Sequence, residues 1–153
     1  MKKALEEVAQ KINTKEDLIF FLEEINVLEN LLFKNTKKLL SEKAEKTIGR
    51  SLGALLKNWE KEGVIPLSPN QAFSFFEKLK KELQKLPQVE LEIAFQPSED
   101  FILKIKKWLE EATGKKLVLN FVIKPEIIGG VVIEYQGKRE NFSLVKKINP
   151  SIF

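Results

Sequence analysis

The spacing of the hydrophobic residues in this 153-residue chain changes at Pro87, and that change decides what the chain can fold into. Before Pro87 the apolar residues recur at steps of three and four, which is the spacing of an amphipathic helix. After it, Val89, Leu91 and Ile93 alternate with glutamates, as in a half-buried strand. We therefore predict an α+β protein, with an all-α helical bundle followed by a small α/β domain that has a mixed sheet.

The helical domain is predicted over residues 1–86, with about four helices. The second helix either ends at a break at 34–37 or continues through this segment as one longer helix. The helices are expected at about 3–12, around Leu18–Leu32, at about 43–61 and after Ser68-Pro69, an N-cap followed by proline. Gly49 and Gly53 fall inside the third of these. We interpret them as positions where a neighbouring element packs closely.

The α/β domain is predicted over residues 87–153. Its elements are strands at 89–95, 117–123, 131–135 and 139–142, a helix from Ser98 to Gly114, and a short amphipathic segment at 143–148. The first strand, the helix and the second strand favour a right-handed βαβ unit. The predicted buried face of the helix consists of Phe101, Ile102, Ile105, Trp108, Leu109 and Ala112.

Two adjacent glycines, Gly129 and Gly130, stand directly before the third predicted strand. Glycine allows a positive φ and a close approach of the backbone to a neighbouring strand. A phosphate-binding loop needs its glycines after a strand and at the start of a helix, which is the opposite order. The pair is therefore interpreted as a turn and not as a nucleotide site.

Cysteine and histidine are absent from the chain, which excludes disulfides, thiolate nucleophiles, the usual zinc sites and a Ser-His-Asp triad. Carboxylate pairs such as Glu23-Glu24 occupy adjacent helical positions, which do not converge on one substrate. We predict no catalytic residue, no metal, no cofactor and no enzymatic activity.

Charged residues make up 31% of the chain, and the net charge of +4 comes from lysines interspersed with glutamates. This pattern is typical of a solvated surface, so no nucleic acid is expected as a partner. The densest apolar cluster, Leu18–Leu22, is far shorter than the roughly 20 residues of a membrane helix. We expect no signal peptide and no direct insertion into a membrane.

A series of motifs follows Val89 in a characteristic order. They are the strand-to-helix junction "AFQPS", a helix ending in "TGKK", the strand "LVLNFVI", the segment "KPEIIGGVVI" and the ending "ENFSLVKKI". In this order they resemble the ATP synthase delta subunit family, whose mitochondrial member is the oligomycin-sensitivity-conferring protein. The resemblance covers residues 89–148, and its most specific part is the Ile-Ile-Gly-Gly segment.

The resemblance implies a non-catalytic subunit of the peripheral stalk, or stator, of a rotary F-type ATP synthase. In that family the helical domain binds N-terminal segments of the alpha subunits on the catalytic head, and the C-terminal domain binds the C-terminal helices of the b subunits. The stalk holds the head against rotation while proton flow drives ATP synthesis. The resemblance also implies a peripheral position at the cytoplasmic face of the inner (plasma) membrane, and we expect the isolated chain to be monomeric.

The same resemblance suggests which residues bind these partners. The candidate b-subunit interface is Pro125, Ile127, Ile128, Gly129, Gly130, Val131, Ser143, Val145 and Ile148. The candidate head interface is Leu5, Val8, Ile12, Phe21, Leu52 and Leu56. Three departures stand out. Lys124 occupies a position where the family usually has aspartate, Asn141-Phe142 replaces the family's aspartate-glycine pair, and the helical part is shorter than the family's six-helix bundle.

Two other classes of function stay open at this stage. One is a related adaptor of a bacterial secretion or flagellar ATPase, although the long glycine-repeat coiled coil typical of such regulators is missing. The other is a small basic nucleic-acid-binding protein, which would show strongly salt-dependent binding.

Overall fold

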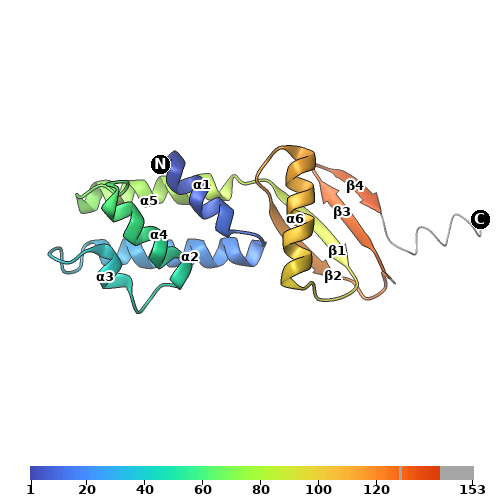
Figure 1. Cartoon of the computed structure of the whole chain (residues 1–153), viewed down its shortest axis with the longest axis horizontal. Coiled ribbons are helices and arrows are strands. Elements are labelled where there is room, and N and C mark those ends of the chain that lie inside the picture. Colours follow the sequence, from blue (N-terminus) through green and yellow to red (C-terminus); the bar gives the residue numbers. More distant parts are fainter. Residues whose placement is uncertain (128, 142–153) are drawn as a thin grey trace, which may run out of the picture. The chain divides into compact units, whose positions relative to one another are not determined.

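The computed structural model describes residues 1–127 and 129–141, and the chain divides into two compact units (Figure 1). The first, here called the helical unit, comprises Met1–Ile12 and Glu16–Leu86. The second, the sheet unit, comprises Asn13–Lys15 and the chain from Pro87 onward. Helices precede a small mixed sheet, so the predicted α+β class is confirmed.

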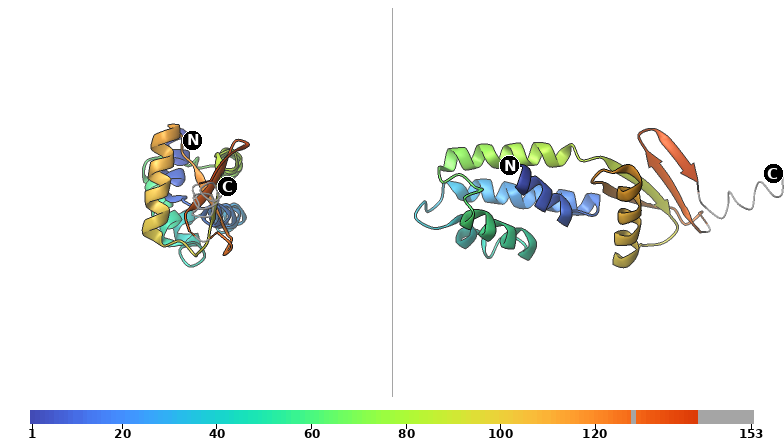
Figure 2. Two further views of the ribbon diagram at one scale, coloured as in Figure 1. Left: turned by 90° about the vertical axis from the view of Figure 1, so that its right-hand side faces the viewer. Right: turned by 45° about the horizontal axis from the view of Figure 1, so that its top comes forward.

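Five helices form before Pro87, where about four were predicted. They are α1 (Lys2–Lys11), α2 (Lys15–Leu32), α3 (Leu40–Ala44), α4 (Arg50–Lys61) and α5 (Pro69–Gln84). The two longest, α2 and α5, run alongside each other (Figure 2) and are joined by an ion pair between Glu29 and Lys80. Fully buried side chains from four helices, among them Val8, Ile25, Trp59 and Phe76, fill the core of the unit.

The predicted single helix at 43–61 is wrong, because α3 ends at Ala44 and α4 begins only at Arg50. Gly49 has an extended backbone and caps α4, and its amide donates to Oε1 of Glu24 on α2. A Cβ atom at Gly49 would lie 3.0 Å from that oxygen, so a neighbour does pack closely there. At Gly53 the nearest side chain would be at an ordinary 3.9 Å. The bond to Glu24 explains why the helix restarts at this glycine.

The sheet unit contains β1 (Gln88–Ile93), α6 (Glu99–Thr113), β2 (Val118–Ile123), β3 (Val131–Tyr135) and β4 (Lys138–Asn141). The strand order is β2-β1-β3-β4, with β1 and β2 parallel and the other pairs antiparallel. The predicted start and end of α6 are confirmed. Ser98 Oγ accepts from the amide of Phe101 at 3.2 Å, and Gly114 takes the left-handed conformation with a φ of 67°. The segment predicted at 143–148 lies outside the described residues.

One face of the sheet packs against α6 (Figure 1), and the core between them contains Val89, Leu91, Leu109, Leu117, Leu119 and Ile133. The predicted buried face of α6 is wrong at two positions, since Trp108 is 54% exposed and Ala112 is also exposed. Lys106 is buried instead. The helix is therefore rotated relative to the prediction, so that the lysine and not the tryptophan lies beside the core.

The burial of Lys106 is explained by three residues that the predicted division placed in the other domain. Asn13 accepts a hydrogen bond from Lys106 Nζ through its Oδ1 at 3.2 Å, and its carbonyl accepts from the Leu119 amide at 2.9 Å. Thr14 pairs with Leu119 in parallel. The segment Asn13–Lys15, which connects α1 to α2, thus lies against the edge of β2 and extends the sheet.

Candidate partner interfaces

The segment from Lys124 to Val131 is the first candidate interface, and its described residues lie between β2 and β3. The Lys124 amide donates to the Ile93 carbonyl at 2.7 Å, and the Ile127 amide donates to the Lys124 carbonyl at 3.0 Å. Gly130 has a φ of 81°, so the predicted positive φ is confirmed there. Val131 then pairs with Ile93. The left-handed residue at the turn is what allows the chain to reverse into β3.

The candidate b-subunit residues differ in how accessible they are. Pro125 and Gly130 are exposed, Gly129 and Val131 are half-buried, and Ile127 is 8% exposed. The remaining candidates, Ile128, Ser143, Val145 and Ile148, lie outside the described residues. The role of this set in binding stays a prediction, and within the described part it rests mainly on the exposed turn.

A single buried carboxylate with two basic partners lies next to this turn. Glu92 is only 4% exposed, and it alternates along β1 with core residues, so it lies on the face of the sheet away from α6. Lys124 Nζ donates to its Oε1 at 2.5 Å, and Arg139 Nη2 donates to its Oε2 at 2.8 Å. These bonds, the one from Lys124 above all, hold the pKa of Glu92 below its usual value despite its burial. Lys124, where the family usually has aspartate, is therefore an ion-pair partner in this chain.

Replacing Lys124 by aspartate is expected to destabilise the sheet unit by about 1–2 kcal/mol, a modest loss because the lysine is partly exposed to water. The change removes a donor and sets a second carboxylate beside Glu92. Urea unfolding followed by hydrogen exchange in the sheet unit measures the effect. Lys104→Asp, on the exposed side of α6, is the matched control. Equal losses in both variants would contradict the assigned role of Lys124.

The sheet unit also carries a partly exposed apolar surface, here called the aromatic edge. It is made of the exposed Phe95 and Ile123 and the half-buried Phe101 and Phe121. Phe95, which follows β1, is 55% exposed, and Ile123, the last residue of β2, is 41% exposed. Phe101 lies between Phe95 and Phe121, with ring centroids 6.2 and 6.4 Å away. Exposed apolar groups gathered in this way are typical of protein interaction sites. The sequence pattern had placed all four residues inside.

In the helical unit, the candidate head-interface residues turn out to lie mostly in the core. Val8, Ile12, Leu52 and Leu56 are fully buried, Phe21 is 5% exposed, and only Leu5 is half-buried. A partner that docks on the folded unit cannot reach the buried five without rearranging it. The large apolar side chains exposed on this unit include Ile19, Phe20, Phe33 and Phe73. Phe33 and Phe73 contact each other, with ring centroids 6.3 Å apart.

Two buried carboxylates of α2 stand out in the same unit, because each has one oxygen without a hydrogen-bond partner among the described residues. Glu24 uses Oε1 to accept from Gly49 and leaves Oε2 unpaired, and Glu29 accepts from Lys80 at 2.7 Å and leaves Oε1 unpaired. Burial raises the pKa of both carboxyl groups above the usual value of 4.5. Their negative charge is therefore unfavourable in the folded unit.

The raised pKa values predict how the stability of the helical unit depends on pH. A carboxyl group with a raised pKa binds its proton more tightly in the folded state than in the unfolded chain. Protonation of Glu24 and Glu29 therefore stabilises the folded unit fully below the unfolded pKa, and this stabilisation is lost as pH rises through the folded pKa. We expect the contribution of these two groups to the free energy of unfolding to fall as the pH rises above their usual pKa of 4.5, and this fall to be smaller in Glu24→Gln. The exposed neighbour, in Glu23→Gln, is the control. A steeper fall in Glu24→Gln would contradict this account.

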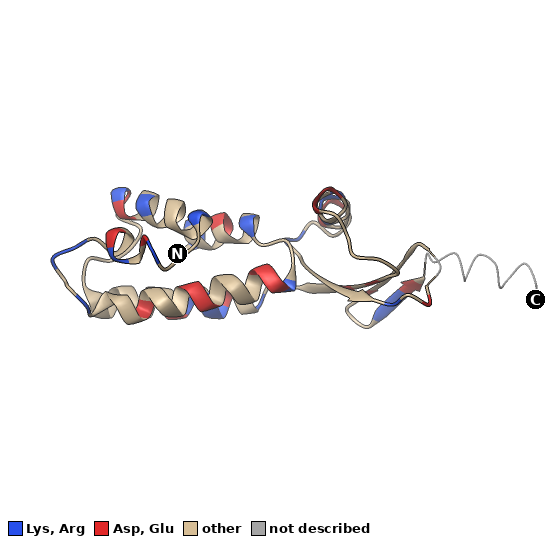
Figure 3. Cartoon of the chain, turned by 90° about the horizontal axis from the view of Figure 1, so that it is seen from below, with Lys and Arg blue, Asp and Glu red and all other residues tan. Residues whose placement is uncertain are grey.

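Two kinds of feature are absent from the described part of the chain. Among residues 1–127 and 129–141 there is no group of three carboxylates that could hold a metal ion, and no helix long and apolar enough to cross a membrane. In the view of Figure 3, segments with lysine or arginine and segments with acidic residues both occur along the helices.

Comparison with known proteins identifies the family. The model of the "ATP synthase delta (OSCP) subunit" family matches residues 1–150 and so includes the helical part, which the sequence motifs did not cover. The ATP synthase subunit delta of Gemmatimonas aurantiaca is 27% identical over 94% of this chain and 75% of its own length. A chain of the Polytomella F-ATP synthase is similar over 44% of this chain and 88% of its own, with 26% identity and a TM-score of 0.40.

The family model spans nearly the whole chain and both of its units. The chain therefore belongs to the ATP synthase delta (OSCP) subunit family, a family of structural and not catalytic subunits of the F-type ATP synthase.

Proposed function

We propose that this chain is a stator subunit that links the b-subunit helices to the top of the catalytic head and keeps the head from turning with the rotor. The observation that carries the proposal is the family match over residues 1–150, which includes both units. A stator must transmit force without doing chemistry. Apolar side chains exposed on both units, which partner proteins can cover, support that role.

The sheet unit is proposed to bind the C-terminal helices of the b subunits. The turn at 124–131 supplies the family signature, and the aromatic edge supplies exposed apolar side chains at the end of the same strands. Helix recognition of this kind places apolar residues at i, i+3, i+4 and i+7 of the partner against such a surface. An interface that holds under load should bury at least the standard area of about 1,600 Å².

The helical unit is proposed to bind N-terminal segments of the alpha subunits. Five of the six predicted contact residues are buried. The residues proposed to contact the alpha subunits are therefore Leu5 and exposed apolar side chains such as Phe20 and Phe33. The proposed position of the subunit is peripheral, at the cytoplasmic face of the membrane. The free chain is proposed to be monomeric.

Add-back to membranes from cells that lack this chain tests the stator role directly. Those membranes should hydrolyse ATP but should synthesise little of it from a proton gradient, because an unrestrained head turns with the rotor. Purified protein should restore proton-driven synthesis. Full synthesis without the chain, or no restoration by protein shown to be folded, would contradict the proposal.

Calorimetric titration with a peptide from the C-terminal end of the same organism's b subunit tests the proposed grip. Ile123→Asp should weaken binding at least tenfold, because it places a charge within the aromatic edge. Ile128→Asp tests the signature turn in the same way, and Phe33→Ser, on the helical unit, is the control that should bind normally. Binding that is unchanged in both isoleucine variants would move the grip elsewhere.

A further inference from the structure

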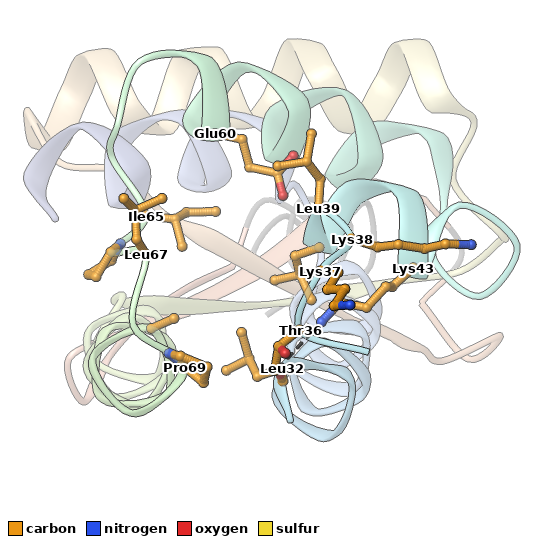
Figure 4. Close-up of a pocket in the computed structure, with 13 residues that line it drawn as sticks. Leu32, Thr36, Lys37, Lys38, Leu39, Lys43, Glu60, Ile65, Leu67 and Pro69 are labelled. Carbon is orange, nitrogen blue, oxygen red and sulfur yellow. Dashed lines mark hydrogen bonds between the residues drawn. The ribbon is translucent and has the colours of Figure 1, made fainter. Parts of the chain in front are cut away.

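A cavity at one end of the helical unit is not used by the proposed grip on the b subunits. It encloses about 250 Å³ between the end of α2, the loop that leads to α3, the last turns of α4 and the loop before α5 (Figure 4). A cavity of about 150 Å³ is enough to hold a benzene ring. The space therefore suits one bulky apolar side chain.

The inner wall of the cavity is apolar and well packed. Leu32, Leu40, Ile65 and Ala72 all line it, and each is at most 8% exposed. Their side chains come from separate elements of the unit, so the wall is held by the fold and not by one mobile loop. An apolar group that enters this space would exchange water for contacts with four buried side chains.

Two leucines at the mouth are exposed to an unusual degree. Leu39 is 55% exposed, and Leu67 is fully exposed although it lines the cavity. Pro66 and Pro69 restrict the backbone on both sides of Leu67, so little conformational entropy is lost when a partner covers it. Leucines held in water at the rim of an apolar cavity are typical of a surface that another molecule covers.

The charges around the mouth are predominantly positive. Lys37, Lys38 and Lys43 line the cavity, and Figure 4 shows Lys38 and Lys43 on the side away from Ile65 and Leu67. Lys43 donates to the carbonyls of Leu31 and Lys34, both at 2.8 Å, so its ammonium group is fixed at the end of α2. Lys37 and Lys38 are exposed and have no ion-pair partner in the described part of the chain.

A single carboxylate opposes these lysines. Glu60 is the acidic residue of the lining, and its Oε1 accepts from the amide of Ser41 at 3.0 Å. Part of its negative charge is thus engaged by the backbone at the start of α3. The mouth keeps an excess of positive charge, with Lys37 and Lys38 available for anionic groups.

We propose that this cavity is a docking site for an acidic peptide segment of a partner protein, which inserts one bulky apolar side chain and sets flanking carboxylates against Lys37 and Lys38. The volume favours a peptide over a long lipid chain, because it accommodates about one side chain. Peptide binding at this cavity does not depend on binding of the b subunits by the sheet unit. An experiment can therefore contradict one of these two proposals and leave the other unaffected.

Titration of the ¹⁵N-labelled full chain with the probe acetyl-Asp-Glu-Phe-Glu-Asp-amide, followed by NMR, tests the proposal. Amide signals of residues 32–43 and 64–72 should shift with saturation in the millimolar range, as expected for a short peptide. The probe with lysines in place of its acidic residues, and the probe with alanine in place of phenylalanine, should each bind at least tenfold more weakly.

Two variants place the binding in the cavity. Lys37→Glu/Lys38→Glu should weaken the acidic probe at least fivefold, the order expected when two exposed charge contacts are reversed. Lys57→Glu/Lys61→Glu, on the exposed side of α4, is the matched control and should bind normally. Ala72→Leu should also weaken binding, because it fills the cavity, and its spectrum reports whether it is folded.

The outcomes separate clearly. Shifts confined to residues lining the cavity, lost with the charge reversal, support the site. No shift at about 5 mM probe, equal binding of the basic probe, or shifts elsewhere in the chain would overturn it. Binding to anionic phosphatidylglycerol vesicles that depends on Lys37 and Lys38, without peptide binding, would also overturn it and indicate a membrane contact instead.

Discussion

Replacing Trp59 by alanine is expected to lower the free energy of unfolding of the helical unit by about 3–5 kcal/mol. Trp59 is fully buried, its Nε1 donates to Glu7 at 2.5 Å, and its ring meets Phe75 edge-on with centroids 6.4 Å apart. The truncation removes the largest buried side chain of the unit and leaves a cavity between α4 and α5. Hydrogen exchange across a urea series, read separately for the two units, measures the loss.

Trp59→Phe separates the volume of the side chain from its hydrogen bond. It keeps most of the ring but leaves the Glu7 carboxylate without its donor, so a smaller loss of about 1–2 kcal/mol is expected. Trp108→Ala is the matched control, because that tryptophan is 54% exposed on α6. A loss in Trp108→Ala as large as that in Trp59→Ala would show that burial does not decide the effect.

Replacing Leu91 by alanine is expected to destabilise the sheet unit by about 2–5 kcal/mol. Leu91 is fully buried on β1, the strand that pairs with both β2 and β3, so its side chain lies at the centre of the core under α6. Few neighbours can move to fill the space, because strands hold it from both sides. The same hydrogen-exchange series should show faster exchange in β1, β2 and β3.

The exposed leucine of α6 provides the comparison for this variant. Leu103→Ala removes the same atoms from a side chain that is 50% exposed, and a change within about 0.5 kcal/mol is expected. If Leu91→Ala accelerated exchange equally in the helical unit, the two units would not unfold separately. That result would contradict the expectation that the two structural units unfold independently.

Much of this fold could be predicted from periodicity, because each long element buries one face. The strand at Gln88–Ile93 alternates apolar residues with glutamates in its sequence, Val131–Tyr135 begins with three β-branched residues, and α6 carries both of its caps in the sequence. A break at the polar segment 34–37 was one of two alternatives that the sequence left open, and the structure has this break between α2 and α3. These features are local, and local patterns are what a single sequence records best.

The errors concern contacts between distant residues. Nothing near Gly49 indicates that Glu24, 25 residues earlier, would bind its amide and interrupt a helix. Nothing near Lys106 indicates that Asn13 would make burial of a lysine acceptable, so Trp108 was placed inside instead. Buried polar groups depend on partners that only the tertiary fold brings together, whereas apolar patterns do not.

The binding role of the candidate interfaces stays a prediction, and the exposure of their residues was predicted less well than the fold, for a related reason. An interface side chain is apolar like a core side chain, so Phe95 and Ile123 were assigned to the interior, and Leu52 and Leu56, which the structure buries, were named as candidate head contacts. Exposure separates the two classes, and exposure depends on which side of an element its neighbours cover. The signature turn could be predicted because its glycines indicate a backbone conformation, whereas the exposure of a side chain depends on its neighbours in the fold.

The path of the chain through Asn13–Lys15 has a practical consequence for dividing this protein into pieces. A fragment that begins at Pro87 would lack the segment whose Asn13 carbonyl accepts from the Leu119 amide. Its β2 edge would present unpaired backbone groups to other molecules, and such an edge invites strand-to-strand aggregation. Recombinant work on the C-terminal half should therefore supply residues 13–15, either fused through a linker or added as a peptide, before poor solubility is blamed on the half itself.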